Sequence, residues 1–390
     1  MKIAFVYDRV NKIGGAERVL TVLHEIWPEA PLYTSVYDEK GAPWAGSFKV
    51  VTSFLNKVAF FRGKHEMLPL VTPYAFESFN FDDFDVVLSV TSQDAKVVMT
   101  KPSTLHICYC LTPTRYLWSG YEDYKDEPGR GFFNPFVRLF MGIAVNRLRK
   151  WDQISAHRPD YYLAVSGLVK ERIKKIYHRQ AEVIYPPVET EIFKPRKKDG
   201  GGNYYLIVSR LVAYKKIDYA IRAFNQTGWK LKIIGGGVDL ERLKKLAGKN
   251  VQIICDNLTD EKLCCYYQKC KALICPGSED FGLAAVEAQA CGKPVISFSG
   301  SGVKETVIPG KTGELYADLT EKSLVAVLHK SQKRKYRPEV CRANAEKFSK
   351  KVFKEIIRKK VESLYESSYF CRRNRNKALA AVSEKFPQTI

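Results

Sequence analysis

The chain has 390 residues and a formal net charge of +21, from 63 lysines and arginines against 42 aspartates and glutamates. Its 45% hydrophobic and 27% charged content is ordinary for a globular protein and excludes wholesale disorder, collagen-like repeats and a small disulfide-stapled fold. No apolar run approaches the roughly 20 residues of a membrane-spanning helix, and the first residues turn polar too soon for a secretory signal. We therefore expect a soluble intracellular protein of two or three domains.

The positive charge is concentrated in two segments. Residues 321–390 hold 19 basic and 7 acidic residues, so +12 of the +21 lies there, and residues 130–150 hold five basic residues and no acid. Such segments suit polyanions, namely nucleic acid, anionic lipid or phosphorylated substrates. A generally lysine-rich composition would produce the same excess of positive charge without any polyanionic partner.

The ten cysteines lack the spacing of a zinc site, so we expect buried free thiols.

Short apolar runs alternate with helical patterns along the first half of the chain. Runs rich in β-branched and aromatic residues predict strands at 2–7, 32–36, 85–90, 105–110, 161–165 and 183–185. Apolar residues at helical spacing predict helices over 16–27 and 136–154.

After a segment rich in proline, charge and glycine, the alternation restarts. Here we expect strands at 204–209, 231–234, 251–255, 272–275 and 294–298, and helices at 218–226, 240–246, 261–269 and 283–291. A further basic helical segment covers 338–365. Strands that alternate with short helices indicate βαβ units and parallel sheets.

The pattern predicts an α/β protein of two doubly wound, Rossmann-like domains in tandem. We expect residues 1–193 to form the first domain, 194–202 the linker and 203–366 the second domain. The last helix of the second domain is a candidate to pack back on the first, and residues 367–390 are expected to form a loose basic tail. In such pairs, ligands bind at the carboxyl ends of the strands, between the domains.

Two cations follow the first strand of the second domain. Arg210 and Lys215 stand just past its end, where they would face the crevice. A nucleotide diphosphate leaving group needs such cations, because negative charge builds on it as the bond breaks. A solvated basic turn would use the same residues.

Near the N-terminus, Gly14-Gly15 opens a helix suited to phosphate or sugar oxygens. The chain has neither a G-x-G-x-x-G turn nor a Walker A motif.

The segment 275–296 carries the most specific pattern. A strand is followed by a loop with Glu279, and then by an alanine-rich helix with a single embedded acid, Glu287. Carboxylates suit sugar and ribose hydroxyls, since each accepts two hydrogen bonds. Taken singly, the first acid would be an ordinary helix N-terminal acid and the second a surface residue. Backbone amides at the start of the helix would bind an anion: Phe281, Gly282 and Leu283.

This segment resembles the E-x₇-E signature of retaining glycosyltransferases with the GT-B fold, specifically family 4. The resemblance covers nearly the whole chain and includes residues 14–17, 209–215, 235–237 and 301–306. It implies sugar transfer from a nucleotide diphosphate donor with retention of configuration, with no metal and no cofactor beyond this co-substrate. By position, the catalytic residues would be Arg210 and Lys215 on the diphosphate and Glu279 on the donor sugar. The donor-binding residues would be Gly15, Phe281, Gly282, Leu283 and, on the ribose, Glu287.

Residues 106–118 resemble a subgroup of family 4 that makes bacterial surface polysaccharides, often through mannosyltransferases. That subgroup commonly has Y-C-H-T-P-x-R-Y-x-W-D, whereas here Leu111 replaces the histidine and Ser119 the aspartate. The histidine is thought to lie near the donor sugar, so one donor contact is in question. His106 is expected inside a strand. Aromatic faces and a guanidinium suit sugars and phosphates, which makes three residues candidates for the acceptor site: Arg115, Tyr116 and Trp118.

A basic and aromatic patch in the first domain fits an in-plane membrane anchor beside the acceptor site. A core helix with a basic solvent face is the alternative. The patch comprises Arg130, Phe132, Phe133, Phe136, Arg138, Leu139, Phe140, Arg147, Arg149 and Lys150.

Three functions from different classes are compatible with these patterns. The first is a retaining, metal-independent hexosyltransferase, with mannose favoured from a GDP- or UDP-linked donor, acting on a glycan or polyprenyl-linked acceptor in polysaccharide or glycolipid biosynthesis. It would work in the cytoplasm, at the inner face of the plasma membrane if residues 130–150 bind lipid. The second is a catalytically silent relative that acts as a scaffold. The third is a nucleic-acid-binding or nucleotide-sugar-binding protein, which is disfavoured because no nucleic-acid-binding motif is recognisable.

The one D-x-D motif, Asp83-Phe84-Asp85, precedes a strand and is interpreted as a loop rather than a metal site.

Overall fold

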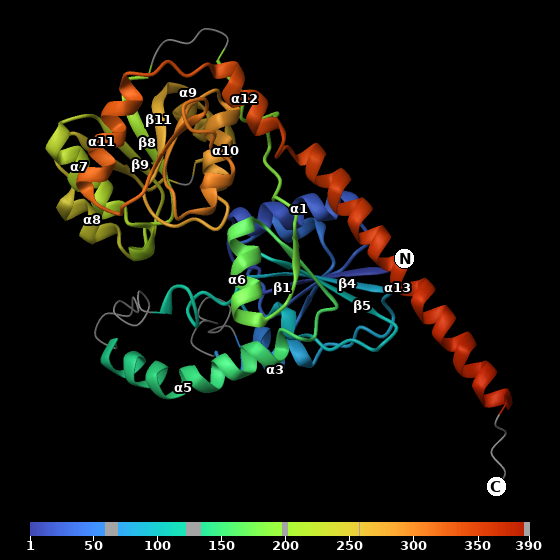
Figure 1. Cartoon of the computed structure of the whole chain (residues 1–390). Coiled ribbons are helices and arrows are strands. Elements are labelled where there is room, and N and C mark those ends of the chain that lie inside the picture. Colours follow the sequence, from blue (N-terminus) through green and yellow to red (C-terminus); the bar gives the residue numbers. More distant parts are fainter. Residues whose placement is uncertain (59–68, 122–133, 197–201, 257, 386–390) are drawn as a thin grey trace.

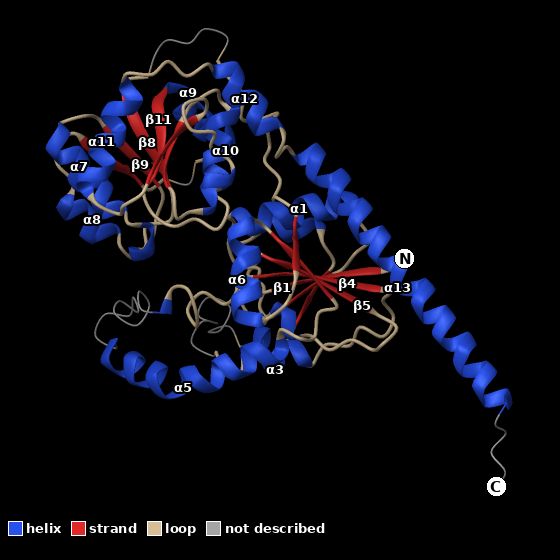
Figure 2. Ribbon diagram, viewed as in Figure 1, coloured by secondary structure: helices blue, strands red, loops and turns tan. Residues whose placement is uncertain are grey.

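The computed structural model describes the chain except residues 59–68, 122–133, 197–201, 257 and 386–390. Within the helices, the side-chain surroundings of 134–141, 143–144 and 369–385 are not described. Two parallel sheets, each covered by helices, form two separate lobes, as Figures 1 and 2 show.

The first domain is built on seven parallel strands in the order β3-β2-β1-β4-β5-β6-β7. The order reverses between β1 and β4, so the carboxyl ends of these two strands form the topological switch point, where such sheets bind ligands. All residues of β1, β4 and β5 are buried, as expected when helices cover both faces. The strands are β1 Ile3–Tyr7, β2 Leu32–Thr34, β3 Val50–Thr52, β4 Val86–Thr91, β5 Leu105–Cys110, β6 Tyr161–Ala164 and β7 Ala181–Val183. The helices are α1 Gly15–Ile26, α3 Thr72–Glu77, α5 Asn134–Ser155 and α6 Gly167–Tyr177, with short 3₁₀ turns at η1 Pro43–Ser47, η2 Phe54–Lys57 and η4 Ala95–Val97.

The second domain has six parallel strands in the order β10-β9-β8-β11-β12-β13. Its order reverses between β8 and β11, so the loops after these two strands meet at a second switch point. The strands are β8 Tyr204–Val208, β9 Leu231–Ile234, β10 Val251–Ile254, β11 Cys270–Cys275, β12 Val295–Phe298 and β13 Gly313–Tyr316. The helices are α7 Ile217–Thr227, α8 Leu240–Leu246, α9 Asp260–Lys269, α10 Leu283–Ala290 and α11 Glu321–Gln332, with 3₁₀ turns at η6 Ala213–Lys215 and η7 Gly302–Glu305.

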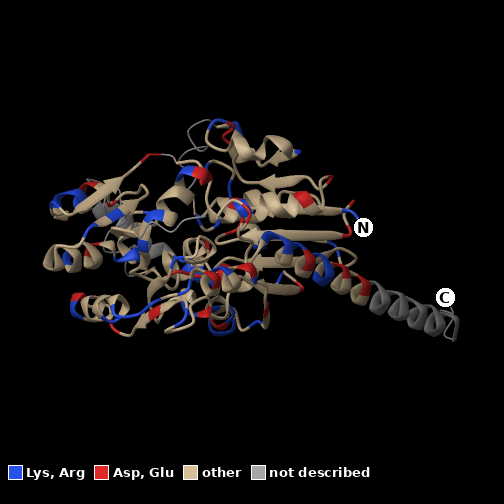
Figure 3. Ribbon diagram, turned by 90° about the horizontal axis from the view of Figure 1, so that it is seen from above, with Lys and Arg blue, Asp and Glu red and all other residues tan. Residues whose placement is uncertain are grey.

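Two C-terminal helices connect the domains. α12 (Pro338–Glu346) packs on α10, and α13 (Lys350–Lys385) then crosses to the first domain, where it contacts α1 and β5 (Figure 1). Lys350 and Lys354 pair with Glu25 of α1, and the helix buries Phe353 and Ile357. In Figure 3 the described turns of α13 carry acidic as well as basic residues.

The structure differs from the sequence expectations at the C-terminus. The helical segment 338–365 is divided in two around Ser349, and the tail expected to be loose from residue 367 is helical through Lys385. A run of strong helix formers, Lys377-Ala378-Leu379-Ala380-Ala381, accounts for this continuation. No helix in the described part of the chain is long and apolar enough to cross a membrane.

Candidate functional site

The candidate site lies where the start of α1 meets the start of α10. A Cβ atom added to Gly15 would stand 2.7 Å from Leu283 Cδ1, so the missing side chain is what lets the first domain approach the second this closely. Gly282, before α10, has φ +90°, a conformation that favours glycine. No side chain caps α10, so its first backbone amides remain available to a ligand. Gly15 and Leu283, which the sequence predicts to share a donor site, are therefore in contact.

Lys215 and Glu279 form an ion pair at the centre of this region. Lys215 Nζ lies 2.5 Å from Glu279 Oε2 and 3.4 Å from the Ser278 carbonyl oxygen. Lys215 follows β8 and Glu279 follows β11, so the switch point of the second sheet brings the two loops together. The Lys215 side chain is 8% exposed and the Glu279 side chain 25% exposed, so the carboxylate is the more accessible member of the pair.

Arg210 follows the same strand, β8, as Lys215 does. Its Nη2 donates to the Tyr214 hydroxyl at 2.7 Å, and the residue is exposed. The guanidinium is thus placed at the mouth of the same loop cluster as Lys215.

The loop that carries Glu279 is held in place by the segment before η7. The Glu279 amide donates to Ser301 Oγ at 3.1 Å, and the Gly302 amide donates to the Glu279 carbonyl oxygen at 2.8 Å. Phe281 is buried, with its ring centroid 5.6 Å from those of both Tyr185 and Phe348. The side chain of Phe281 therefore anchors the loop, and only its backbone amide is a candidate donor contact.

Glu287 is a buried carboxylate rather than a surface residue. It is 6% exposed, and its Oε2 accepts a hydrogen bond from the Tyr267 hydroxyl at 2.7 Å. Burial raises the pKa of Glu287, while Arg18 and the Tyr267 hydroxyl oppose that change. Arg18 belongs to α1 of the first domain and makes a two-pronged ion pair with Asp260 at 2.5 and 2.8 Å. Glu287 thus lies in the field of a cation from the opposite domain.

Asp280, for which the sequence predicts no role, joins the two domains. Its carboxylate accepts hydrogen bonds from Arg115 Nη2 and, at 2.5 Å, from Arg172 Nη1, both from the first domain. Burial would raise the pKa of Asp280, but the two arginines hold it below its usual value. Arg115 also lies over the Tyr214 ring, 4.5 Å from its centroid. The sequence-predicted acceptor residue Arg115 is therefore engaged with the donor loop, and its acceptor role stays a prediction.

A second acid from the same domain caps α6. Glu305 accepts from the Gly167 and Leu168 amides at 2.8 and 3.0 Å, where a carboxylate is stabilised by the positive end of the helix. The Tyr185 hydroxyl donates to the same group at 3.2 Å. The ion pairs of Asp280 and the hydrogen bonds of Glu305 both link the second domain to the first.

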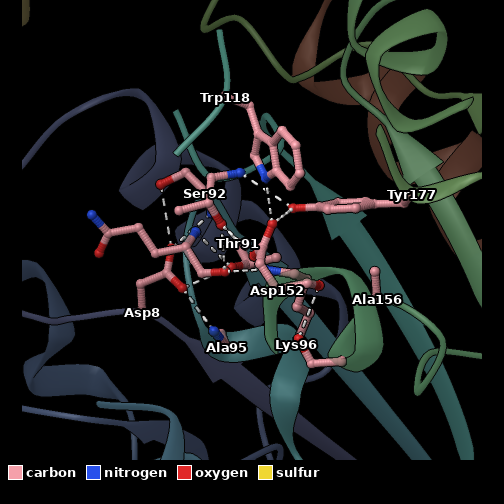
Figure 4. A network of polar contacts seen from close by, with 12 residues as sticks. Asp8, Thr91, Ser92, Ala95, Lys96, Trp118, Asp152, Ala156 and Tyr177 are labelled. Atoms are coloured by element: carbon pink, nitrogen blue, oxygen red, sulfur yellow. Dashed lines mark hydrogen bonds and ion pairs between the residues drawn. The ribbon is translucent and has the colours of Figure 1, made fainter. Parts of the chain in front are cut away.

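Trp118 belongs to a buried polar network in the first domain (Figure 4). Asp152 accepts from Trp118 Nε1 at 2.7 Å, from the Tyr177 hydroxyl at 2.9 Å and from Lys96 Nζ at 2.6 Å. The indole N–H of Trp118 is therefore already used inside the protein. Tyr116 and Trp118 are both partly exposed, and their role in binding an acceptor stays a prediction.

The switch point of the first sheet is organised by Asp8. Its carboxylate accepts from Thr91 Oγ1 and the Ser92 amide at 2.7 Å and from the Ala95 amide at 2.9 Å, which ties the loop after β1 to the loop after β4 (Figure 4). Next to it, burial raises the pKa of Asp94 to about 7, with Lys96 acting in the opposite direction. A carboxyl group that can exchange a proton near neutral pH thus lies at this crevice.

His106 takes no part in the site. It is fully buried, with Nε2 2.9 Å from Ser89 Oγ, and burial lowers its pKa to about 3. The position after β5 that carries histidine in the related subgroup is occupied here by the partly buried Leu111. Nothing at His106 substitutes for that histidine.

The proposed membrane patch falls largely outside what the structure describes. Arg130, Phe132 and Phe133 lie outside the described residues, and no side-chain surroundings are described for Phe136, Arg138, Leu139 and Phe140. Arg147 and Lys150 are exposed on α5, whereas Arg149 stacks on Trp118 and Tyr121. The membrane anchor stays a prediction. Among the described residues, no group of three histidine, cysteine or acidic side chains is placed to hold a metal ion.

Comparison with known proteins finds a family match for part of the chain. Residues 188–348 match the family described as glycosyl transferases group 1. An uncharacterized glycosyltransferase of Methanocaldococcus jannaschii is 31% identical over 217 residues, which are 53% of this chain and 59% of that protein. A GDP-mannose-dependent alpha-(1-6)-phosphatidylinositol monomannoside mannosyltransferase of Mycolicibacterium smegmatis is 29% identical over 183 residues, 40% of this chain and 48% of that protein. The matches thus span about half the length of these relatives.

The whole architecture has a counterpart among solved structures. Anabaena HepE, solved in complex with UDP-glucose, superposes with a TM-score of 0.69 over 93% of this chain and 100% of that one, at 15% identity. At this identity the likeness concerns the fold alone. Both domains and the C-terminal helices therefore have the GT-B fold.

Proposed function

We propose that this chain, whose residues 188–348 belong to the glycosyl transferases group 1 family and whose two domains have the GT-B fold, is a retaining glycosyltransferase that uses a nucleotide-sugar donor. The observation that carries the proposal is the Lys215–Glu279 ion pair beside the uncapped start of α10, opposite Gly15. A cation for a diphosphate, a carboxylate for sugar hydroxyls and free amides are brought together at one switch point.

Each residue then has a distinct task. Donor binding replaces the Lys215–Glu279 pair with two new contacts, since Lys215 turns to the diphosphate and Glu279 accepts from hydroxyls of the sugar. Arg210 adds a second cation at the leaving group, where charge grows as the glycosidic bond to phosphate breaks. Glu287 Oε2 is occupied by Tyr267, so Oε1 is the atom that we assign to the ribose.

We further infer that the sugar is mannose and that the donor is GDP-linked or UDP-linked. The Mycolicibacterium smegmatis relative is GDP-mannose-dependent by name, and HepE was solved with UDP-glucose. Residues 106–118, which resemble the subgroup rich in mannosyltransferases, add support for mannose.

The acceptor that we propose is a glycan or a polyprenyl-linked glycan in polysaccharide or glycolipid biosynthesis. The residues that would meet it are Arg115, Tyr116 and Trp118, on the first-domain side of the crevice. The basic segment 130–150 would hold the enzyme on the anionic inner face of the plasma membrane, where each cation near the surface is worth about 1 kcal/mol. The protein would thus work in the cytoplasm and at that membrane.

The test is a screen of GDP-, UDP-, dTDP- and ADP-sugars, read first as thermal stabilisation and then as release of nucleoside diphosphate. One donor should raise the melting temperature well above the others, and that donor should be turned over. In Lys215→Ala we expect turnover to fall by about 10²–10³-fold, the usual loss when a charged donor is removed from a leaving-group site.

The matched control is Lys322→Ala, which removes an exposed lysine of α11 in the same domain and should behave as wild type. Stabilisation by a donor without any turnover would instead indicate the catalytically silent relative. No response to any donor would overturn the proposal.

A further inference from the structure

Two cysteines face each other behind the candidate donor site. Cys264, on α9, and Cys291, at the end of α10, have their sulfur atoms 3.7 Å apart. Both are buried, with 6% and 2% exposed, and both are free thiols in the structure. The other described cysteines include two exposed ones, Cys255 and Cys265, which provide an internal comparison.

The surroundings make these two thiols chemically unequal. The contact with the Cys291 sulfur lowers the pKa of Cys264 to about 6, while the same contact raises the pKa of Cys291. Gln268 Nε2 also donates to the Cys264 sulfur at 3.3 Å. The lower pKa favours Cys264 as the nucleophile of the pair.

We propose that Cys264 and Cys291 are a site of reversible oxidation, which a peroxide converts into a disulfide between α9 and α10. The Cys264 thiolate attacks one peroxide oxygen, the O–O bond breaks, and hydroxide leaves as Cys264 becomes a sulfenic acid. The Cys291 sulfur then attacks the Cys264 sulfur, the S–O bond breaks, and water leaves. In sum, two thiols and one hydrogen peroxide give one disulfide and two waters.

The geometry permits this bond. A disulfide needs its sulfur atoms about 2.05 Å apart, so the two must approach by about 1.7 Å from the 3.7 Å seen here. Each sulfur turns on its own Cβ, and Cys291 lies just past the last residue of α10, where the chain is not confined by helical hydrogen bonds on both sides.

The consequence for the donor site rests on the proposed function, but formation of the bond does not. Tyr267 lies one turn beyond Cys264 on α9, and Glu287 lies one turn before Cys291 on α10. These two residues share the 2.7 Å hydrogen bond that orients Glu287. Drawing the helices together at the sulfurs changes that contact, so we expect the oxidised protein to bind nucleoside diphosphate several-fold more weakly.

The experiment treats the full-length protein with hydrogen peroxide and maps its cysteines by peptide mass spectrometry. We expect one cross-linked peptide pair, Cys264 with Cys291, lighter than the reduced pair by two hydrogen atoms and restored by a thiol reductant. In Cys291→Ser the reaction should stop at a Cys264 sulfenic acid, trapped by a dione reagent. In Cys264→Ser no sulfenic acid should form at Cys291.

Cys265→Ser is the matched control, because it removes an exposed thiol next to the pair and should leave the disulfide unchanged. Oxidation of Cys255 and Cys265 alone, with Cys264 and Cys291 still reduced, would overturn the proposal. If the disulfide forms but nucleoside diphosphate binds equally well to both forms, the oxidation site stands and its link to Glu287 falls. A failure of donor binding in the reduced protein would count against the proposed function only.

Discussion

Glu279 is the residue whose exchange best separates sugar recognition from nucleotide recognition. Glu279→Gln keeps the shape of the side chain but removes the charge that pairs with Lys215 at 2.5 Å. We expect turnover to fall by about 10²-fold or more, since a carboxylate binds sugar hydroxyls better than an amide does. The affinity for free nucleoside diphosphate, measured by calorimetry, should not fall, because Lys215 no longer has to leave an ion pair to contact the diphosphate. Asp83→Asn, an exposed acid of the first domain, is the control and should alter neither quantity. An equal loss of turnover and nucleoside diphosphate affinity would show that Glu279 does not bind the sugar.

Asp94 gives a pH-dependent test that does not need a substrate. Burial raises its pKa to about 7 in the folded protein, above the ordinary aspartate value. A raised pKa means that folding favours the protonated form, so this stabilising contribution is present at acidic pH and is lost as pH rises through about 7. Asp94→Asn stays neutral throughout, so its free energy of unfolding should improve relative to wild type as pH rises from about 4 to about 7, by at most about 4 kcal/mol, and change little further above that. Urea unfolding at several pH values measures this, and parallel curves for the two proteins would contradict it.

Single residues also show how far the sequence alone could be interpreted. Gly15 and Leu283 are predicted as parts of one site from motifs far apart in the chain, and the structure brings them into contact. Lys215 and Glu279 are likewise predicted as neighbours of a donor and form a pair. Asp280 has no predicted role, because its partners Arg115 and Arg172 come from other segments, and only the packing of the two domains brings them together.

At the scale of elements, the buried strands are the best predicted and the short or mixed elements the worst. β5 and β9 have the expected bounds, because mainly apolar residues stand there between polar breaks. β3 and β13 have no expectation in the sequence. β3 has only three partly buried residues, and β13 contains Gly313 and a buried Glu314, which lower its apolar signal. α13 is longer than expected because helix propensity continues where the apolar pattern fades.

Packing of α13 on the first domain can be tested with two adjacent isoleucines. Ile357 is fully buried, whereas Ile356, its neighbour, is 47% exposed. Ile357→Ala should lower the free energy of unfolding by about 2–4 kcal/mol, through lost burial and the cavity left behind. Ile356→Ala is the matched control and should cost less than about 1 kcal/mol, since it leaves no cavity. Equal, small effects in denaturant unfolding would show that α13 does not pack on the first domain in solution.

At the scale of the whole molecule, charged side chains from both domains hold the structure in its present arrangement. Asp280 with Arg115 and Arg172, Arg18 with Asp260, and Glu305 on the start of α6 all cross from one domain to the other. Partly buried pairs of this kind are costly to break from one side, because the remaining charge is left without its partner. Their position around the start of α10 couples the arrangement of the domains to the candidate donor site.

Asp280→Asn tests this coupling, because it removes the one carboxylate that both Arg115 and Arg172 contact. We expect it to disfavour the present arrangement by about 2–4 kcal/mol, since both arginines lose the charge of Asp280. Small-angle X-ray scattering should then show a larger radius of gyration, and the affinity for nucleoside diphosphate should fall because Gly15 moves away from Leu283.

Glu241→Gln, which breaks an exposed ion pair with Lys244 within α8, is the control and should leave both measurements unchanged. Saturating donor should bring the scattering of Asp280→Asn back towards wild type, since a ligand that touches both domains replaces the lost link. If the variant scatters as the wild type does without ligand, the remaining contacts of Arg18 and Glu305 are sufficient, and Asp280 does not control the arrangement of the domains.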